Sequence, residues 1–179
     1  MKNIIALLLL LFIFNFASKA QNKYFTKSGT IIFDGKATLD KIHAENKSAA
    51  CVLDAVAGTL RFTVLMKGFE FKKALMQTHF NEKYVESPLY PKSEFNGQII
   101  NNSTVKYNTD GVYTVSVKGK LTIHGQTKEV TASGKITVKN GKVNLNSIFT
   151  ILVPDYKIKA NMKDQVTISV DCSLDVLTN

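Results

Sequence analysis

The clearest pattern in the chain is a strict alternation of apolar and polar residues on both sides of Gly125. Apolar side chains occupy odd positions over Tyr113–Ile123 and even positions over Val130–Val138. Period-two alternation is typical of strands with one dry and one wet face. Because glycine readily adopts positive φ, His124-Gly125-Gln126 is expected to reverse the chain. The segments Val112–Ile123 and Lys128–Lys139 are therefore predicted to form a long antiparallel hairpin.

The same alternation predicts strands through most of the remaining chain. Lys139-Asn140-Gly141-Lys142 is typical of a type I′ hairpin turn that leads into the strand after it. We expect the first two strands to be short and broken at Asp34-Gly35. The predicted strands outside the long hairpin are Thr30–Phe33, Ala37–Ala44, Ser48–Val56, Thr59–Met66, Glu94–Ile100, Val143–Ile151 and Gln165–Val176.

One short helix and one loop interrupt the predicted strands. Lys72–Phe80 is the helix candidate, because Leu75, Met76, His79 and Phe80 form a stripe at helical spacing. Asn81–Ser93 follows and contains Pro88 and Pro91, so it is predicted to be a loop. Consecutive hairpins with one short helix indicate an all-β chain that closes as an antiparallel up-and-down barrel. An immunoglobulin-type sandwich is less favoured, since the chain has no tryptophan.

The first twenty residues have the pattern of a secretion signal. Lys2 precedes an apolar run, and Ser18 and Ala20 are the small residues expected before a cut at Gln21. An uncleaved membrane anchor is the alternative, but the run is short for a span. We expect an exported protein, periplasmic or secreted, with a signal over 1–20 and one domain over 21–179. No stable membrane span is expected in the mature chain.

Charge and cysteine content restrict the partners only weakly. Without Lys2 and Lys19 the mature chain has 21 basic and 14 acidic residues, a net charge of +7. The lysines are spread along wet strand faces without interleaved exposed aromatics, so nucleic-acid binding is not expected. Cys51 and Cys172 remain in the mature chain after the predicted cut. They are either buried small residues or a disulfide, and the sequence leaves both alternatives open.

No catalytic or metal-binding pattern stands out. His43, His79 and His124 lie far apart in sequence, and no pair has the spacing of a zinc site. His124, in a tight turn, is expected to be exposed, and His79 is expected to hydrogen-bond locally on the helix. No phosphate-cradling glycine loop and no nucleophile elbow are present. We therefore expect no enzyme, no metal and no cofactor other than a bound lipid.

The inward-facing aromatic and aliphatic side chains are the candidates for a ligand site. They either fill the barrel or line a cavity for an apolar or amphiphilic lipid. Lys72, Lys73 and Lys83 flank the helix and its loop, where they would meet an anionic head group. The predicted lining residues are Phe62, Val64, Met66, Phe69, Phe71, Met76, Phe80, Tyr113, Val115, Leu121, Ile123 and Phe149.

Three blocks of sequence resemble the YceI-like, polyisoprenoid-binding family. They are the helix and following loop (Phe69–Ser87), the segment Tyr90-Pro-Lys-Ser-Glu-Phe-Asn-Gly, and the hairpin from Gly119 to Val130 with Leu-Thr-Ile-His-Gly-x-Thr-Lys. The resemblance implies a lipocalin-like antiparallel barrel, covered by a helix, that holds an isoprenoid or similar lipid. An Arg-Asp pair often found before the helix in that family is replaced by Lys72-Lys73, which leaves the ligand open. An interaction module with a filled core remains the alternative.

Overall fold

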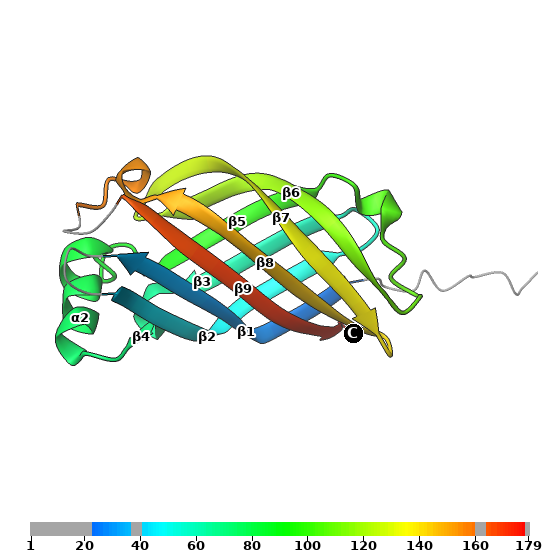
Figure 1. Cartoon of the computed structure of the whole chain (residues 1–179), viewed down its shortest axis with the longest axis horizontal. Coiled ribbons are helices and arrows are strands. Elements are labelled where there is room, and N and C mark those ends of the chain that lie inside the picture. The colour runs from blue at the N-terminus through cyan, green and yellow to red at the C-terminus, as the bar shows by residue number, and fades with distance from the viewer. Residues whose placement is uncertain (1–22, 37–40, 160–163, 178–179) are drawn as a thin grey trace, which may run out of the picture.

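The fold is a closed antiparallel β-barrel. The computed structural model describes residues 23–36, 41–159 and 164–177, so the predicted signal over 1–20 lies outside the described residues. One nine-stranded sheet has the order β1-β9-β8-β7-β6-β5-β3-β2-β4, and pairing of β1 with β2 closes it (Figure 1). Since β4 has two residues and pairs only with β2, the other eight strands form the wall. The predicted up-and-down barrel with a short helix is confirmed.

The strands follow one another around the barrel in sequence order, apart from the segment between β3 and β5 that contains β4 and α2. The two-residue β4 pairs with β2, and β3 pairs with β5; the other consecutive strands pair antiparallel with each other, as expected when hairpins follow one another. Their bounds are β1 Lys23–Lys36, β2 Lys41–Asp54, β3 Thr59–Leu65, β4 Glu70–Phe71, β5 Lys92–Ile99, β6 Gly111–Ile123, β7 Gln126–Lys139, β8 Lys142–Leu152 and β9 Gln165–Val176.

The first two strands differ from the sequence prediction. The predicted break at Asp34-Gly35 is wrong, because β1 continues through both residues as far as Lys36. The segments expected as separate strands before and after Asn46 form one strand, β2. Register shifts in the β1–β2 ladder lie between Thr26 and Ile31. A local irregularity of this kind bends a strand without ending it.

The helical elements lie at the two ends of the barrel. α2 (Ala74–His79) confirms the predicted helix and continues as a π-helical turn, η2 (Phe80–Tyr84). The predicted loop over Asn81–Ser93 is therefore shorter than expected, since η2 takes its start and β5 begins at Lys92. The remaining single turns are η1 (Met66–Gly68), η3 (Asn102–Thr104) and η4 (Val153–Tyr156).

Both predicted tight turns have the backbone that their sequences indicate. His124 and Gly125 join β6 to β7 with φ of 49° and 67°. Asn140 and Gly141 join β7 to β8 with φ of 52° and 76°. Positive φ at both central residues defines the type I′ turn, whose twist matches that of paired strands.

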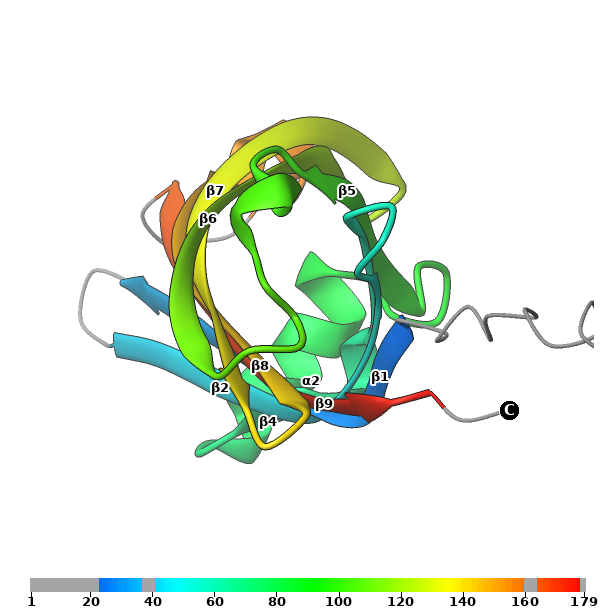
Figure 2. The ribbon, with the colours of Figure 1, turned by 90° about the vertical axis from the view of Figure 1, so that its right-hand side faces the viewer.

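One end of the barrel is filled by side chains. Figure 2 looks into this end, with α2 at the far side, and the segment between β5 and β6 crosses the opening. From that segment Val105 and Tyr107 pack into a core cluster with residues such as Leu53 and Leu174. Tyr107 stacks on Tyr24 with ring centroids 5.9 Å apart. This packed end, the floor of the barrel, leaves the α2 end for a ligand site.

Candidate functional site

A cavity extends inside the barrel from the α2 end to the core cluster of the floor, where Leu60 and Ile99 border it. Its volume is about 480 Å³, and side chains from almost every strand line it. All the predicted lining residues except Tyr113 border it. Most of the lining is aliphatic or aromatic, and an apolar wall with few polar groups suits a hydrocarbon chain.

Tyr113 lies elsewhere in the barrel. Its side chain packs against the core cluster of the floor, and its hydroxyl donates a hydrogen bond to the carbonyl of Thr109 at 3.1 Å. The alternation correctly predicts that this face of β6 points inward, since Val115, two residues further on, borders the cavity. Inward direction alone therefore does not tell which residues face the cavity and which face the floor.

Aromatic side chains close the cavity beneath α2. Phe80, buried at the start of η2, lies 4.9 Å from Phe71 and 5.6 Å from Phe69, measured between ring centroids. Phe33 of β1 reaches the same ring at 6.3 Å. Such tilted and edge-on pairs stabilise beyond the area they bury. The short helix is thus held down by its aromatic residue, and Met76 adds a flexible thioether to the cavity wall.

The π-helical turn has a packing reason. The amide of Val85 donates to the carbonyl of Phe80 at 2.9 Å, a five-residue step. Phe80 and Val85 are both buried and both border the cavity. An ordinary α-helical turn spaces inward residues by three or four, so the wider turn directs both side chains into the barrel.

His124 ties three segments together at the α2 end. Its Nε2 lies 2.6 Å from Glu86 Oε2, its Nδ1 lies 3.1 Å from the Tyr156 carbonyl, and its ring contacts Tyr90 edge-on at 4.4 Å. The expectation that His124 is exposed is wrong, since its side chain is 11% exposed. Both ring nitrogens of His124 thus face oxygen atoms of other segments, one of Glu86 and one of Tyr156.

The remaining polar groups near the cavity are few. His79 makes the predicted local contact, with its Nε2 3.4 Å from Lys83 Nζ. Burial, and then the charge of Asp155, raise the pKa of the Tyr156 phenol to about 12. Lys72 and Lys83 are exposed on the outside of this end. The predicted contact between these flanking lysines and an anionic head group therefore stays a prediction.

Cys51 and Cys172 are free and buried in the floor, so the disulfide alternative is not formed. Burial, followed by the charge of Asp171, raises the pKa of the Cys172 thiol to about 12. Burial also raises the pKa of Cys51. Since the thiolate is the reactive form, these thiols serve as packing groups.

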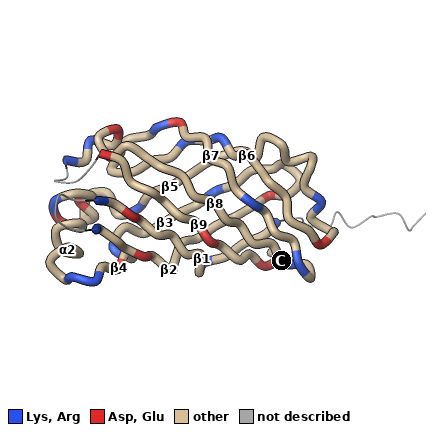
Figure 3. Tube along the Cα trace, viewed as in Figure 1, with Lys and Arg blue, Asp and Glu red and all other residues tan. Residues whose placement is uncertain are grey.

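Among residues 23–36, 41–159 and 164–177, no group of three or more His, Cys, Asp and Glu side chains could hold a metal ion. Within the same ranges no helix has the length and apolar character to cross a membrane. Figure 3 shows basic and acidic residues interspersed along the strands.

Part of the cavity wall was not predicted from the sequence. The missed residues come from every side of the barrel. Several of them, such as Val130 and Leu145, share the dry-face parity of the predicted set, so the signal was present. The main missed lining residues are Ile31, Phe33, Ile42, Tyr84, Val85, Phe95, Val117, Val130, Ala132, Leu145, Ile151, Val153, Tyr156, Ile158, Ile168 and Val170.

Fold and site together define an eight-stranded up-and-down barrel with an apolar interior cavity. The sequence profile of the YceI-like domain matches residues 15–174, so the chain belongs to the YceI-like family. A comparison with curated proteins gives no match.

Solved structures with the same fold share little sequence with this chain. A polyisoprenoid-binding domain from Saccharophagus degradans, implicated in plant cell wall breakdown, is 10% identical with a TM-score of 0.77, over 88% of this chain and 99% of that one. Burkholderia cenocepacia BcnA is 16% identical with a TM-score of 0.66, over 82% and 95%. The Campylobacter jejuni YCEI protein is 17% identical with a TM-score of 0.55, over 70% and 78%. These likenesses support the fold.

Proposed function

We propose that this protein binds an apolar or amphiphilic lipid, such as an isoprenoid, with the hydrocarbon chain enclosed in the barrel. The observation that carries the proposal is the apolar cavity of about 480 Å³. Protein interiors are otherwise close-packed, and voids larger than a water molecule are few. A cavity of this volume lies within the usual range of small-molecule sites.

The energetics favour an occupied cavity. At about 24 cal/mol per Å³, an empty apolar cavity of 480 Å³ costs at most about 12 kcal/mol, similar to the whole stability of a domain. A methylene group is close in volume to water, which occupies about 30 Å³, so the cavity holds on the order of 16 carbons. At about 0.8 kcal/mol for each buried methylene, such a chain contributes about 13 kcal/mol. The free energy gained by burying the chain thus offsets the cost of the empty cavity.

The family supports the same class of ligand. One neighbour of this fold is described as a polyisoprenoid-binding domain, and the chain has the YceI-like profile over residues 15–174. The capacity of on the order of 16 carbons sets a limit, since a longer polyisoprenoid would extend outside the cavity. Catalysis forms no part of the proposal.

We further propose that the protein is exported and cut before Gln21, on the support of Lys2, the apolar run and the Ser18/Ala20 pair. The mature protein would then act in the periplasm or outside the cell. N-terminal sequencing of the protein from the exported fraction tests this. Recovery of chains that begin at Met1 would contradict it.

Native mass spectrometry of the purified protein tests lipid binding directly. We expect a lipid-sized mass that is lost on denaturation. Leu121→Phe, which narrows the cavity without changing its polarity, should reduce retention, whereas the matched change at the exposed Leu89 should not. If the wild type neither carries lipid nor takes it up on titration, the interaction-module alternative stands instead.

A further inference from the structure

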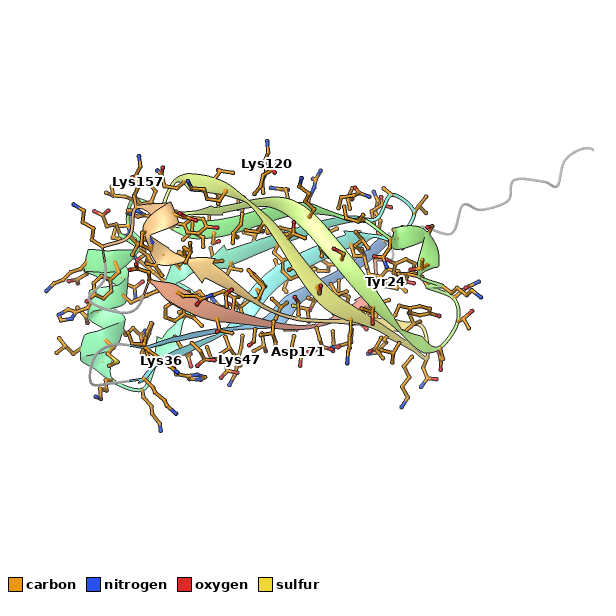
Figure 4. All side chains as sticks on the ribbon, turned by 45° about the horizontal axis from the view of Figure 1, so that its top comes forward. Tyr24, Lys36, Lys47, Lys120, Lys157 and Asp171 are labelled. Atoms are coloured by element: carbon orange, nitrogen blue, oxygen red, sulfur yellow. The ribbon has the colours of Figure 1, made fainter. Side chains whose placement is uncertain are left out.

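The barrel wall separates between β7 and β8. Their ladder runs from Lys139·Lys142 to Gly134·Ser147 and stops there. Beyond this point β7 stays paired with β6 and β8 stays paired with β9. The last link is a hydrogen bond of 2.7 Å from Ser147 Oγ to the Ser133 carbonyl. We call the gap between residues 126–133 and 148–152 the β7–β8 slot; in Figure 4 the two strands diverge toward the α2 end.

The cavity borders outward-facing residues at the closed end of this slot. Lys135 and Asn146 pair across the ladder, and both are exposed because their side chains alternate with inward residues. Both nevertheless border the cavity, together with Gly134 and Ser147. A cavity that touches residues of both wall faces opens through the wall at that place.

A depression on the outside of the wall adjoins the same place. Its volume is about 210 Å³, and it shares Asn146, Ser147 and Val170 with the cavity. Ile148, which is 72% exposed, borders the depression next to the slot. Apolar surface and polar side chains therefore lie together outside the opening, as an amphiphile requires where its chain leaves the barrel.

The other routes into the cavity are occupied by side chains. The floor is packed by Val105, Tyr107 and the residues around them. The α2 end is covered by the rings of Phe69, Phe71 and Phe80. The β7–β8 ladder is lost along the slot, but Val153 and Tyr156 pack with Val130 over its α2 side. The closed end beside Ser147 is therefore the open part, where backbone amides and carbonyls without ladder partners need polar groups. Water or a polar head group supplies such partners, whereas a hydrocarbon chain does not.

We infer that the ligand is an amphiphile whose anionic head group lies at the β7–β8 slot beside Lys135, while its chain extends toward α2. This inference rests on the proposed function and adds the class of head group and its position. Among the described residues Lys135 has no ion-pair partner. Asn146 and Ser147 provide amide and hydroxyl donors next to it. The nearest acid along this row of the sheet, Asp171, borders the outer depression beyond Asn146 and accepts a hydrogen bond from Asn144 at 2.9 Å. An anionic group is therefore favoured on the Lys135 side of Asn146.

The position of the head group is testable because the chain has no tryptophan, so one introduced tryptophan is a unique fluorophore. Phe149→Trp places it by the slot and Met76→Trp places it under α2, both on the cavity wall. Bromine quenches only close fluorophores. We expect 2-bromohexadecanoate to quench Phe149→Trp more strongly and 16-bromohexadecanoate to quench Met76→Trp more strongly. Circular dichroism checks that each variant is folded.

The charge of the head group has an independent test that needs no tryptophan. At low salt, Lys135→Glu should weaken binding of monomeric hexadecanoate about fivefold and strengthen binding of hexadecyltrimethylammonium. Lys120→Glu is the matched control and should change neither affinity, because this exposed lysine on β6 pairs with Glu129, six residues along β7 from Lys135 (Figure 4). Titration calorimetry measures all three proteins.

The outcomes separate the two proposals. Uptake with the reversed quenching pattern, or equal effects of Lys135→Glu and Lys120→Glu, would place the head group elsewhere and overturn this inference alone. In that case, the affinity of Lys83→Glu for hexadecanoate tests whether the head group lies at the α2 end. No uptake of any of these amphiphiles by the wild-type protein would overturn the proposed function, and the inference with it.

Discussion

The two type I′ turns allow one backbone effect to be separated from one packing effect. Gly125 and Gly141 both hold the second central position of a two-residue turn, with φ of 67° and 76°. A side chain at Gly141 would meet nothing within 4 Å. A Cβ at Gly125 would lie 2.8 Å from Cε1 of Tyr90. Alanine at the two positions therefore adds the same backbone strain but different steric strain.

The magnitudes follow from these contacts. A non-glycine residue in the left-handed region costs about 1 kcal/mol, which is the whole expected effect of Gly141→Ala. Gly125→Ala bears the same strain and also displaces the Tyr90 ring from the edge of His124, at 4.4 Å. An aromatic contact of this kind contributes about 0.5–1.5 kcal/mol. We expect Gly125→Ala to destabilise by about 2 kcal/mol, and Gly125→Val by more because valine is β-branched.

Urea denaturation followed by circular dichroism measures both variants against the wild type. An unchanged slope with a lower midpoint would show a change in stability rather than in the denatured state. Gly141→Ala is the control for strain, and Tyr90→Ala in the Gly125→Ala background is the control for the clash. If Gly125→Ala costs no more than Gly141→Ala, Tyr90 does not pack on the turn as described.

Three further predictions use other features of the barrel. His124→Ala removes two hydrogen bonds, each of about 1 kcal/mol, and should lower the melting temperature by several degrees, with Glu86→Gln lowering it less. The raised pKa of Cys172, about 12 against an ordinary 9.0, means that the unfolded chain loses this proton first, so stability should fall as pH rises from about 9 toward 12, and less steeply in Cys172→Ala. Removal of bound lipid should lower the melting temperature, and added hexadecanoate should restore it.

The sequence predicted the long hairpins because their information is local. Alternation sets the faces of β6 and β7, and the Asn140-Gly141 turn sets the register of β8. The helix over Lys72–Phe80 and the final strand Gln165–Val176 were likewise predicted from short-range patterns. The break at Asp34-Gly35 failed because turn-forming residues also occur within a strand whose two neighbours hold it.

The site was predicted less completely than the fold, for a physical reason. Parity identifies inward side chains, but it does not tell at which height of the barrel they lie, and so Tyr113 was assigned to the cavity. His124 was expected in solvent because a turn is normally exposed. Its burial depends on Glu86 and Tyr156, which are 38 and 32 residues away in sequence. The β7–β8 slot depends on where a ladder ends, and an unbroken alternation in both strands does not reveal this.

The two halves of the barrel differ in how they are closed rather than in the kind of residues they contain. At the floor, Val105 and Tyr107 enter the barrel and fill it. At the other end, α2 and η2 lie across the opening, and Phe80 and Val85 pack against the wall instead of filling the space. The filled half contributes stability whether or not a ligand is bound, while a chain bound in the cavity adds further stability. Large apolar residues in both halves are therefore compatible with one end that supports the fold and another that binds.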